Sequence, residues 1–405
     1  MPSLSSGPEQ SAGEPRRPKR ASEEQGRVVM QPGRPRPLFF TGKRPKRDRH
    51  SRRKVAFFHF RNYEPAFKFF VEQVLDADFI PLPPPTRRTV KIGEELSSDY
   101  VCTPFKHIMG DYVEALERGA DVLVQVTGFC RLNYYGELAQ MILRDRGYAD
   151  FDMLNFSDVG TGKVRDYVAY CKKVVNPNLS IPHGVKGLYA AWRMVEHIDE
   201  FRDLYLARAG FAQEAGSFER VRRSFIARMN AATTLSDIET GFRQSVDELE
   251  ALPIDKPADP VRVAILGEYY TAQDPSSNLG LEQKLLDMGV ELVNYMSISN
   301  FNLHYNADAT RASITEYSRF DMGPTSSFNI AAAKRAAEEG FDGIVHIKSA
   351  GCTPEIDVMP PLQRISRDYH VPVLFLTFDT QTSDAGLDTR LEAFYDMIAM
   401  RKVRS

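Results

Sequence analysis

The sequence predicts an α/β protein with two parallel-sheet lobes, and three observations lead to this prediction. From about residue 54 onward, apolar stretches of strand length alternate with stretches of helical length, a pattern typical of parallel sheets covered by helices. A run of helix, glycine, aspartate, buried strand and cysteine occurs twice, at 114–130 and at 335–352. The chain has 405 residues, more than the roughly 250–300 that one hydrophobic core usually serves. We therefore expect two similar halves.

The residues before position 54 differ in composition from the rest of the chain. They are rich in Pro, Gly, Ser and Arg and have no apolar periodicity, so we expect residues 1–53 to form a disordered basic tail. Its basic run at 43–54 suits nucleic acid or anionic lipid, with a solvated tail as the alternative. The net charge of the whole chain is −2, so the remainder is acidic.

The first α/β domain is predicted at 54–160. A continuous apolar run predicts its first strand at 54–60. An extended segment at 97–104 precedes a helix that Pro104 opens, because proline suits the first helical turn. The remaining elements expected here are a helix at 64–75, strands at 79–82, 122–126 and 152–156, and a helix at 135–146.

A helical region is predicted at 161–253, because strand signals are weak there, and a proline-marked linker at 253–260 follows it. The second α/β domain is predicted at 254–405. Its strand at 261–270 matches the one at 54–60, and later elements include strands at 291–294, 343–347 and 371–378 and a last helix from about 389. Crossovers between the parallel strands should be right-handed.

Three of the four cysteines occupy one kind of position. Cys102 lies just before a helix, where the thiol pKa is lowered, and Cys130 and Cys352 lie just past buried strands. Ligands bind at the carboxyl edge of such sheets, so the three thiols converge if the two halves face each other there. Three thiolates suit an iron–sulfur cluster or zinc, and an open metal position suits catalysis. Unrelated packing residues are the alternative, since cysteine is often buried.

Other polar residues lie near the same strand ends. His346 and Lys348 flank the end of the last strand before Cys352, and Glu355 follows it, so we predict these three as catalytic residues. A hydrogen-bonded structural role is the alternative for His346. Cys171 lies in a helical pattern, where we expect a small buried side chain. The loop at 379–386 is either an anion site at a helix start or a capped turn.

Several motifs together resemble the 2-hydroxyacyl-CoA dehydratase superfamily, and in particular its stand-alone branch of acyl-CoA dehydratase activase-related proteins. The resemblance extends from about residue 54 to the C-terminus. The stretches that carry it are Cys102-Thr103-Pro104-Phe105-Lys106, Gly110-Asp111-Tyr112-Val113-Glu114-Ala115-Leu116, Gly128-Phe129-Cys130, Gly351-Cys352-Thr353-Pro354-Glu355, Phe378-Asp379-Thr380-Gln381-Thr382 and Thr389-Arg390-Leu391-Glu392-Ala393-Phe394.

This resemblance implies two flavodoxin-like domains with a [4Fe-4S] cluster between them. By position, Cys102, Cys130 and Cys352 carry over as the cluster ligands, with one iron left open to substrate. It further implies an actin-like-fold ATPase activator that donates an electron, and dehydration of an acyl-CoA-like substrate through a ketyl radical. The activase-related branch leaves other difficult reductions open. The chain lacks activator-type phosphate loops, so it resembles the electron acceptor, in a homo- or hetero-oligomer.

Two alternatives belong to other classes of protein. One is a non-catalytic iron–sulfur electron-transfer protein or cluster carrier, and the other is a metal-free α/β binding domain. Nucleotide hydrolysis is disfavoured, because neither G-x-x-x-x-G-K-[ST] nor G-x-G-x-x-G is present. No apolar run approaches the roughly 20 residues that cross a bilayer, and the N-terminus has no apolar signal segment. We therefore expect a cytoplasmic protein with no membrane role.

Overall fold

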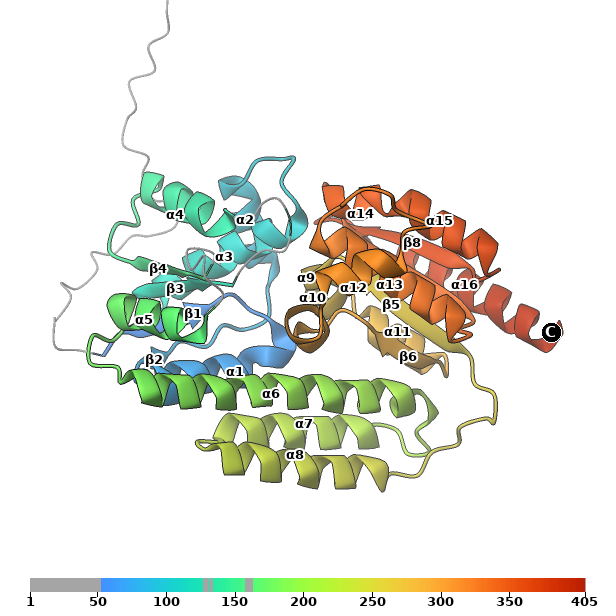
Figure 1. Ribbon diagram of the computed structural model, residues 1–405, viewed down its shortest axis with the longest axis horizontal. Helices are drawn as coiled ribbons and strands as arrows, with labels where there is room; N and C mark the ends of the chain where they lie inside the picture. Colours follow the sequence, from blue (N-terminus) through green and yellow to red (C-terminus); the bar gives the residue numbers. More distant parts are fainter. Residues whose placement is uncertain (1–51, 127–129, 131–133, 157–162, 405) are drawn as a thin grey trace, which may run out of the picture.

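Two four-stranded parallel sheets form the centres of two lobes that lie side by side (Figure 1). The computed structural model describes residues 52–126, 130, 134–156 and 163–404. The first sheet has the order β2-β1-β3-β4 and the second has the order β6-β5-β7-β8. All paired strands run parallel, so every connection between consecutive strands crosses over the sheet. The connections from β2 to β3 and from β6 to β7 pass the central strand β1 or β5 to reach its other side. The predicted fold class, α/β with two parallel sheets, is confirmed.

The first lobe contains four strands and the helices around them. These elements are β1 (Lys54–Phe57), η1 (Arg61–Tyr63), α1 (Glu64–Phe69), η2 (Phe70–Val74), β2 (Asp78–Phe79), α2 (Arg87–Leu96), α3 (Thr103–Glu117), β3 (Val122–Gln125), α4 (Tyr135–Asp145) and β4 (Asp152–Asn155).

Helix α2 is absent from the sequence prediction and sets the position of α3. It begins at a capping box in which Thr86 and Thr89 exchange hydrogen bonds between side chain and backbone. The two helices approach closely through glycines: a Cβ on Gly93 would lie 1.7 Å from the carbonyl oxygen of Lys106, and one on Gly110 would lie 2.0 Å from that of Thr89. A larger residue at either place would push α3, and the cysteine at its start, away from α2.

Helices without strands connect the two lobes. They are α5 (Val164–Val174), α6 (Ile181–Arg208), η4 (Ala209–Phe211), α7 (Ser217–Ala231) and α8 (Leu235–Glu250). Helix α6 has 28 residues and runs beneath both lobes, while α7 and α8 lie against its far side (Figure 1). The boundaries 54–160, 161–253 and 254–405 remain a prediction, and most of the tail at 1–53 lies outside the described residues.

The second lobe repeats the plan of the first with more helices. Its elements are β5 (Arg262–Gly267), α9 (Tyr269–Gln273), α10 (Pro275–Asn278), α11 (Leu281–Asp287), β6 (Glu291–Asn294), η5 (Ser299–Leu303), α12 (Ala307–Ser313), α13 (Pro324–Glu338), β7 (Gly343–Ser349), α14 (Thr353–Asp357), α15 (Met359–Asp368), β8 (Val373–Phe378) and α16 (Asp384–Arg404).

The second sheet is covered on both faces, as strand β5 shows. Its residues Val263 and Ile265 belong to a large apolar cluster that continues through the helical region into the first lobe. Ala264 and Leu266 belong to a separate cluster. Alternate residues of a strand point to opposite faces, so the two clusters lie on opposite sides of the sheet.

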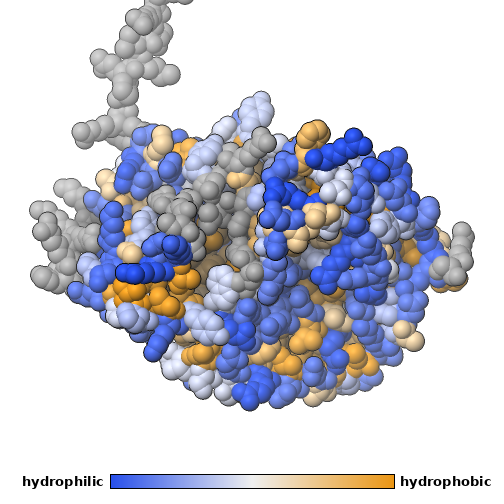
Figure 2. All heavy atoms as spheres, viewed as in Figure 1, coloured by the Kyte–Doolittle hydropathy of each residue, from blue (hydrophilic) through white to orange (hydrophobic). Residues whose placement is uncertain are grey.

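The visible surface carries mostly hydrophilic side chains, with apolar residues in smaller groups (Figure 2). In the part of the chain that the structure describes, no helix combines the length and the apolar content that a membrane crossing requires.

Candidate functional site

The carboxyl ends of the two sheets meet where the first lobe contacts the second. The backbone N–H of Thr103, at the start of α3, donates to the hydroxyl oxygen of Ser349, the last residue of β7, at 3.2 Å. Gly351 has φ +78°, and a Cβ there would lie 3.1 Å from the carbonyl oxygen of Tyr100. A glycine therefore permits this close approach. The contact brings Cys102, the N-cap of α3, beside Cys352, the N-cap of α14.

Cys102 is partly buried and contacts a tyrosine of its own lobe. Its Sγ lies 2.6 Å from the hydroxyl oxygen of Tyr135, the first residue of α4. Burial raises the pKa of the Cys102 thiol to about 11; the Tyr135 hydroxyl opposes this rise, and negative charge on Glu268 adds to it. The expectation that a helix start lowers this pKa is therefore wrong for the metal-free thiol. The loss of solvation on burial raises the pKa by more than the N-terminal end of the helix dipole lowers it.

The three predicted ligand thiols share one electrostatic environment. Burial raises the pKa of the Cys352 thiol, and negative charge on Glu268, Glu355 and Cys102 raises it further. Cys130 in turn contributes to the raised pKa of Cys102. Cys352 is 9% exposed, and Cys102 and Cys130 are partly exposed. Cys102 therefore lies close enough to both Cys130 and Cys352 for their charges to interact, at the junction where the first lobe contacts the second.

No group of three or more His, Cys, Asp or Glu side chains among the described residues has the spacing to hold a metal ion. Cys171 lies in α5, away from the junction of the lobes, and is 2% exposed, as expected for a small buried side chain. Burial raises the pKa of its thiol to about 12.

Two residues near the thiols are not among the predicted site residues, although the aromatic stretch at 128–137 suits a substrate wall. Tyr135 is 7% exposed, and Glu268 directly follows β5. The Glu268 carboxylate caps α9, accepting from the backbone N–H groups of Tyr270 and Thr271 at 3.0 and 2.8 Å. Burial raises the pKa of Glu268, and these hydrogen bonds oppose the rise. Glu268 lies directly past a buried strand, and the same position led to the prediction of Cys130 and Cys352 as ligands.

His346 and Glu355 form a buried pair within the second lobe. Nε2 of His346 lies 2.8 Å from Oε2 of Glu355, and both side chains are fully buried. The side-chain amide of Asn329 donates to both Glu355 oxygens, at 3.0 and 3.2 Å. Burial raises the pKa of Glu355, while His346 and Lys348 lower it. Lys348, at the end of β7, is partly exposed. The pair links β7 to α14, and the catalytic role of the three residues stays a prediction.

The loop at 379–386 uses its hydroxyl and backbone groups within itself. Oδ1 of Asp379 accepts from the backbone N–H of Gln381 at 2.8 Å and from the hydroxyl of Thr382 at 2.9 Å. The Thr382 oxygen accepts from the backbone N–H of Asp379 at 2.9 Å. This geometry favours the capped turn over the anion site.

Residues 228–398 match the family model of 2-hydroxyglutaryl-CoA dehydratase, D-component. This segment of the chain is therefore a domain of the 2-hydroxyacyl-CoA dehydratase superfamily. The search of curated proteins found no match. The superfamily match contains Glu268, His346, Cys352 and Glu355. Cys102, Cys130 and Tyr135 lie outside it, and the contact of Thr103 with Ser349 joins the two parts.

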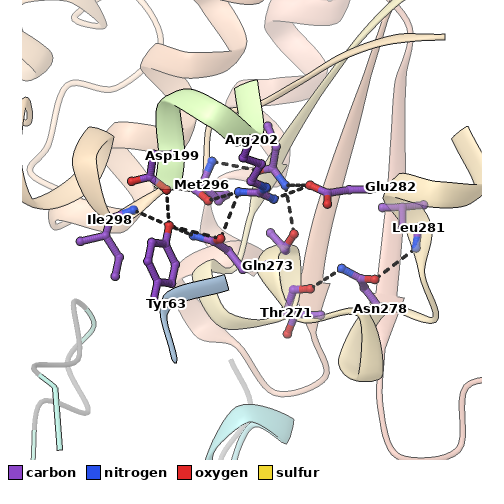
Figure 3. Close-up of polar contacts among 12 residues, drawn as sticks. Tyr63, Asp199, Arg202, Thr271, Gln273, Asn278, Leu281, Glu282, Met296 and Ile298 are labelled. Carbon is purple, nitrogen blue, oxygen red and sulfur yellow. Dashed lines mark hydrogen bonds and ion pairs between the residues drawn. The ribbon is translucent and has the colours of Figure 1, made fainter. Parts of the chain in front are cut away.

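A buried polar network joins the matched domain to the first lobe (Figure 3). The Asp199 carboxylate of α6 accepts from the hydroxyl of Tyr63 in the first lobe at 2.5 Å. It also accepts from the backbone N–H and hydroxyl of Ser299 in the second lobe, at 2.9 and 2.6 Å. Burial raises the pKa of Asp199, and these donors oppose the rise. One carboxylate therefore holds three segments together.

Arg202, one turn further along α6, extends this network into the second lobe (Figure 3). Its guanidinium donates to Oε1 of Gln273 at 3.0 Å and to the carbonyl oxygen of Met296 at 3.3 Å, and it pairs with Glu282. The ring of Tyr270 stacks on that of Phe60 with centroids 5.6 Å apart, so aromatic contacts also cross between the lobes. These contacts set the relative position of the two sheet edges that carry the cysteines.

Proposed function

We propose that this chain is a [4Fe-4S] redox component of the 2-hydroxyacyl-CoA dehydratase type. In this proposal Cys102, Cys130 and Cys352 hold the cluster and leave one iron open. When bound, the cluster supplies one electron at a time for a difficult reduction or a radical dehydration of an acyl-CoA-like substrate. An actin-like-fold ATPase activator is the proposed electron donor.

The observation that carries this proposal is the meeting of Cys102 and Cys352 across the two lobes. They are 250 positions apart in the sequence, yet Ser349 and Gly351 contact the segment around Cys102. Sulfur donors suit iron–sulfur clusters. The all-sulfur donor set supports this assignment, and it would suit zinc as well.

The raised thiol pKa values predict that metal binding at these cysteines depends on pH. A buried thiol with a raised pKa stays protonated at neutral pH, while a bound metal deprotonates its thiol ligands outright. Iron binding should therefore release protons and depend on pH.

Among the three residues predicted to act in catalysis, Lys348 is the one that retains solvent access. We propose that the His346–Glu355 pair positions Cys352, because the pair fixes β7 to the helix that follows this cysteine. Lys348 remains the proposed contact for a negatively charged part of the substrate.

Anaerobic reconstitution with iron and sulfide tests the proposal. Wild-type protein should bind about four irons and four sulfides per chain, the composition of one such cluster. Cys102→Ser, Cys130→Ser and Cys352→Ser should each lose most of this iron, while Cys171→Ser should keep it. Equal iron content in all four variants would defeat the ligand assignment. A cluster that does not respond to an acyl-CoA in its EPR spectrum would favour the cluster carrier over the enzyme.

A further inference from the structure

The hydroxyl of Tyr135 is directed at the sulfur of Cys102 by packing on both sides. The distance between the hydroxyl oxygen and Sγ is 2.6 Å, and Tyr135 is 7% exposed. Its ring packs on that of Phe105, in the first turn of α3, with centroids 4.7 Å apart. The ring that carries the hydroxyl is therefore held by the same helix that begins at Cys102.

The backbone beside Tyr135 is fixed as well. A Cβ on Gly136 would lie 2.7–2.9 Å from the side-chain amide of Asn155, the last residue of β4. The start of α4 thus packs tightly against the edge of the first sheet. Little freedom remains for the Tyr135 hydroxyl to turn toward another partner.

We propose that Tyr135 is a positioning residue that donates a hydrogen bond to the Cys102 sulfur when this sulfur binds iron, and that it thereby raises the reduction potential of the cluster. This inference rests on the proposed function. A metal-bound thiolate has no proton, so the hydroxyl is the donor. Reduction adds negative charge to the cluster, and hydrogen bonds to its sulfurs stabilise that charge.

The effect should distinguish Cys102 from Cys352. In the described part of the chain, the Cys102 sulfur has a buried tyrosine hydroxyl as partner, whereas no hydroxyl is found at hydrogen-bond distance from the Cys352 sulfur. The hydrogen bond would thus make the irons at these two ligands inequivalent. Outer-shell partners of this kind tune metal sites without binding the metal.

The test compares Tyr135→Phe with Tyr134→Phe. Tyr134 is the neighbouring tyrosine and is 48% exposed, so its variant controls for the loss of a hydroxyl from this segment. Both proteins are reconstituted anaerobically, and iron content and midpoint potential are measured by EPR-monitored redox titration. We expect Tyr135→Phe to keep its iron and to have a more negative potential than wild type, while Tyr134→Phe keeps both values.

An unchanged potential in iron-loaded Tyr135→Phe overturns this inference and leaves the proposed function intact. Absence of iron from the reconstituted wild-type chain defeats both the proposed function and the inference. The iron content of the wild-type protein therefore distinguishes the two failures. If Tyr135→Phe itself loses iron, incorporation of 3-fluorotyrosine at position 135 decides the matter. Its more acidic hydroxyl is a stronger donor and should move the potential upward; no movement would overturn the inference.

Discussion

The two lobes share a backbone plan, and their equivalent positions differ in chemistry. Val55 pairs with Val122 in the first sheet, and Val263 pairs with Gly343 at the same register in the second. Asp121 accepts from the backbone N–H of Lys54 at 3.0 Å, and Asp342 accepts from that of Arg262 at 2.8 Å. The repeated aspartate therefore makes the same link between the two central strands in each lobe.

The differences between the lobes concentrate at the carboxyl edges. Where the first lobe has the neutral Gln125 at the end of β3, the second has His346, paired with Glu355. The N-cap of α3 is Cys102, while the N-cap of the corresponding helix α13 is Gly323. Of the three proposed ligand thiols, the first lobe thus carries two and the second carries one. The shared backbone supports the lobes, and the loops beyond the strands give each lobe its chemistry.

The largest difference in lost unfolding free energy is expected between His346→Ala and Gln125→Ala, two substitutions at equivalent strand positions of the two lobes. Removing His346 leaves a fully buried carboxyl without its main partner, which should cost about 3–5 kcal/mol of unfolding free energy. Removing Gln125 leaves the hydroxyl of Tyr112 with the carbonyl oxygen of Val124, so the cost should be about 1–3 kcal/mol. Urea unfolding measures both. Equal losses would show that the pair is not a structural specialisation of the second lobe.

The next effect concerns the carboxylate that holds both lobes to α6. Asp199→Ala leaves the buried donors of Tyr63 and Ser299 without this acceptor and should cost about 3 kcal/mol. Glu200→Gln, at a half-exposed neighbouring position, should cost less than about 1 kcal/mol. Fluorescence of Trp192, the single tryptophan, reports unfolding of α6. A loss below about 1 kcal/mol for Asp199→Ala would mean that the lobes hold together without this joint.

A pH-dependent effect should arise at Asp111, which faces the second lobe. Burial raises the pKa of this carboxyl well above 3.8, and charge on Asp274 of the second lobe adds to the rise. Between the unfolded and folded pKa values the native state binds more protons, so wild-type stability should fall as the pH rises above about 4. Asp111→Asn removes this titration while retaining an acceptor for the backbone N–H of His59.

The difference in unfolding free energy between wild type and Asp111→Asn should therefore shift in favour of the variant from pH 4 to pH 7. The slope should be at most about 1.4 kcal/mol per pH unit. Asp308→Asn, with a side chain that is 91% exposed, serves as the control and should give a curve parallel to that of wild type. A parallel curve for Asp111→Asn as well would contradict the prediction.

The smallest losses of unfolding free energy should come from replacing one glycine in each lobe, and these two losses should be equal. Gly119 and Gly340 precede the two repeated aspartates by two positions and have φ +93° and +73°. A Cβ would contact nothing within 4 Å at either place, so alanine should cost only the backbone strain of about 1–2 kcal/mol. Unfolding free energies of Gly119→Ala and Gly340→Ala should agree within about 0.5 kcal/mol. A larger difference would show that the repeat is similar in sequence but not in energetics.

Local sequence signals predicted most strands and helices. They failed where contact with a distant segment determines whether a helix forms or what a side chain does. Helix α2 was missed although Thr86 and Thr89 form its capping box, since close packing on α3 through Gly93 supports it. His346 was predicted as a catalytic residue from its place at a strand end, but Glu355 and Asn329 enclose it. Tyr135 was missed because nothing near it in the sequence shows that its hydroxyl meets Cys102.

By itself, the sequence determined the α/β class, the repetition of one unit in two halves and the position of three thiols beyond strand ends or before a helix. These properties follow from periodicity and from local turn and cap chemistry, which act over a few residues. Only the tertiary structure decided that Cys102 meets Cys352, that Tyr135 contacts the first of them, and that Asp199 holds both lobes. These contacts join residues 33 to 246 positions apart, and the folding of both lobes around α6 brings them together.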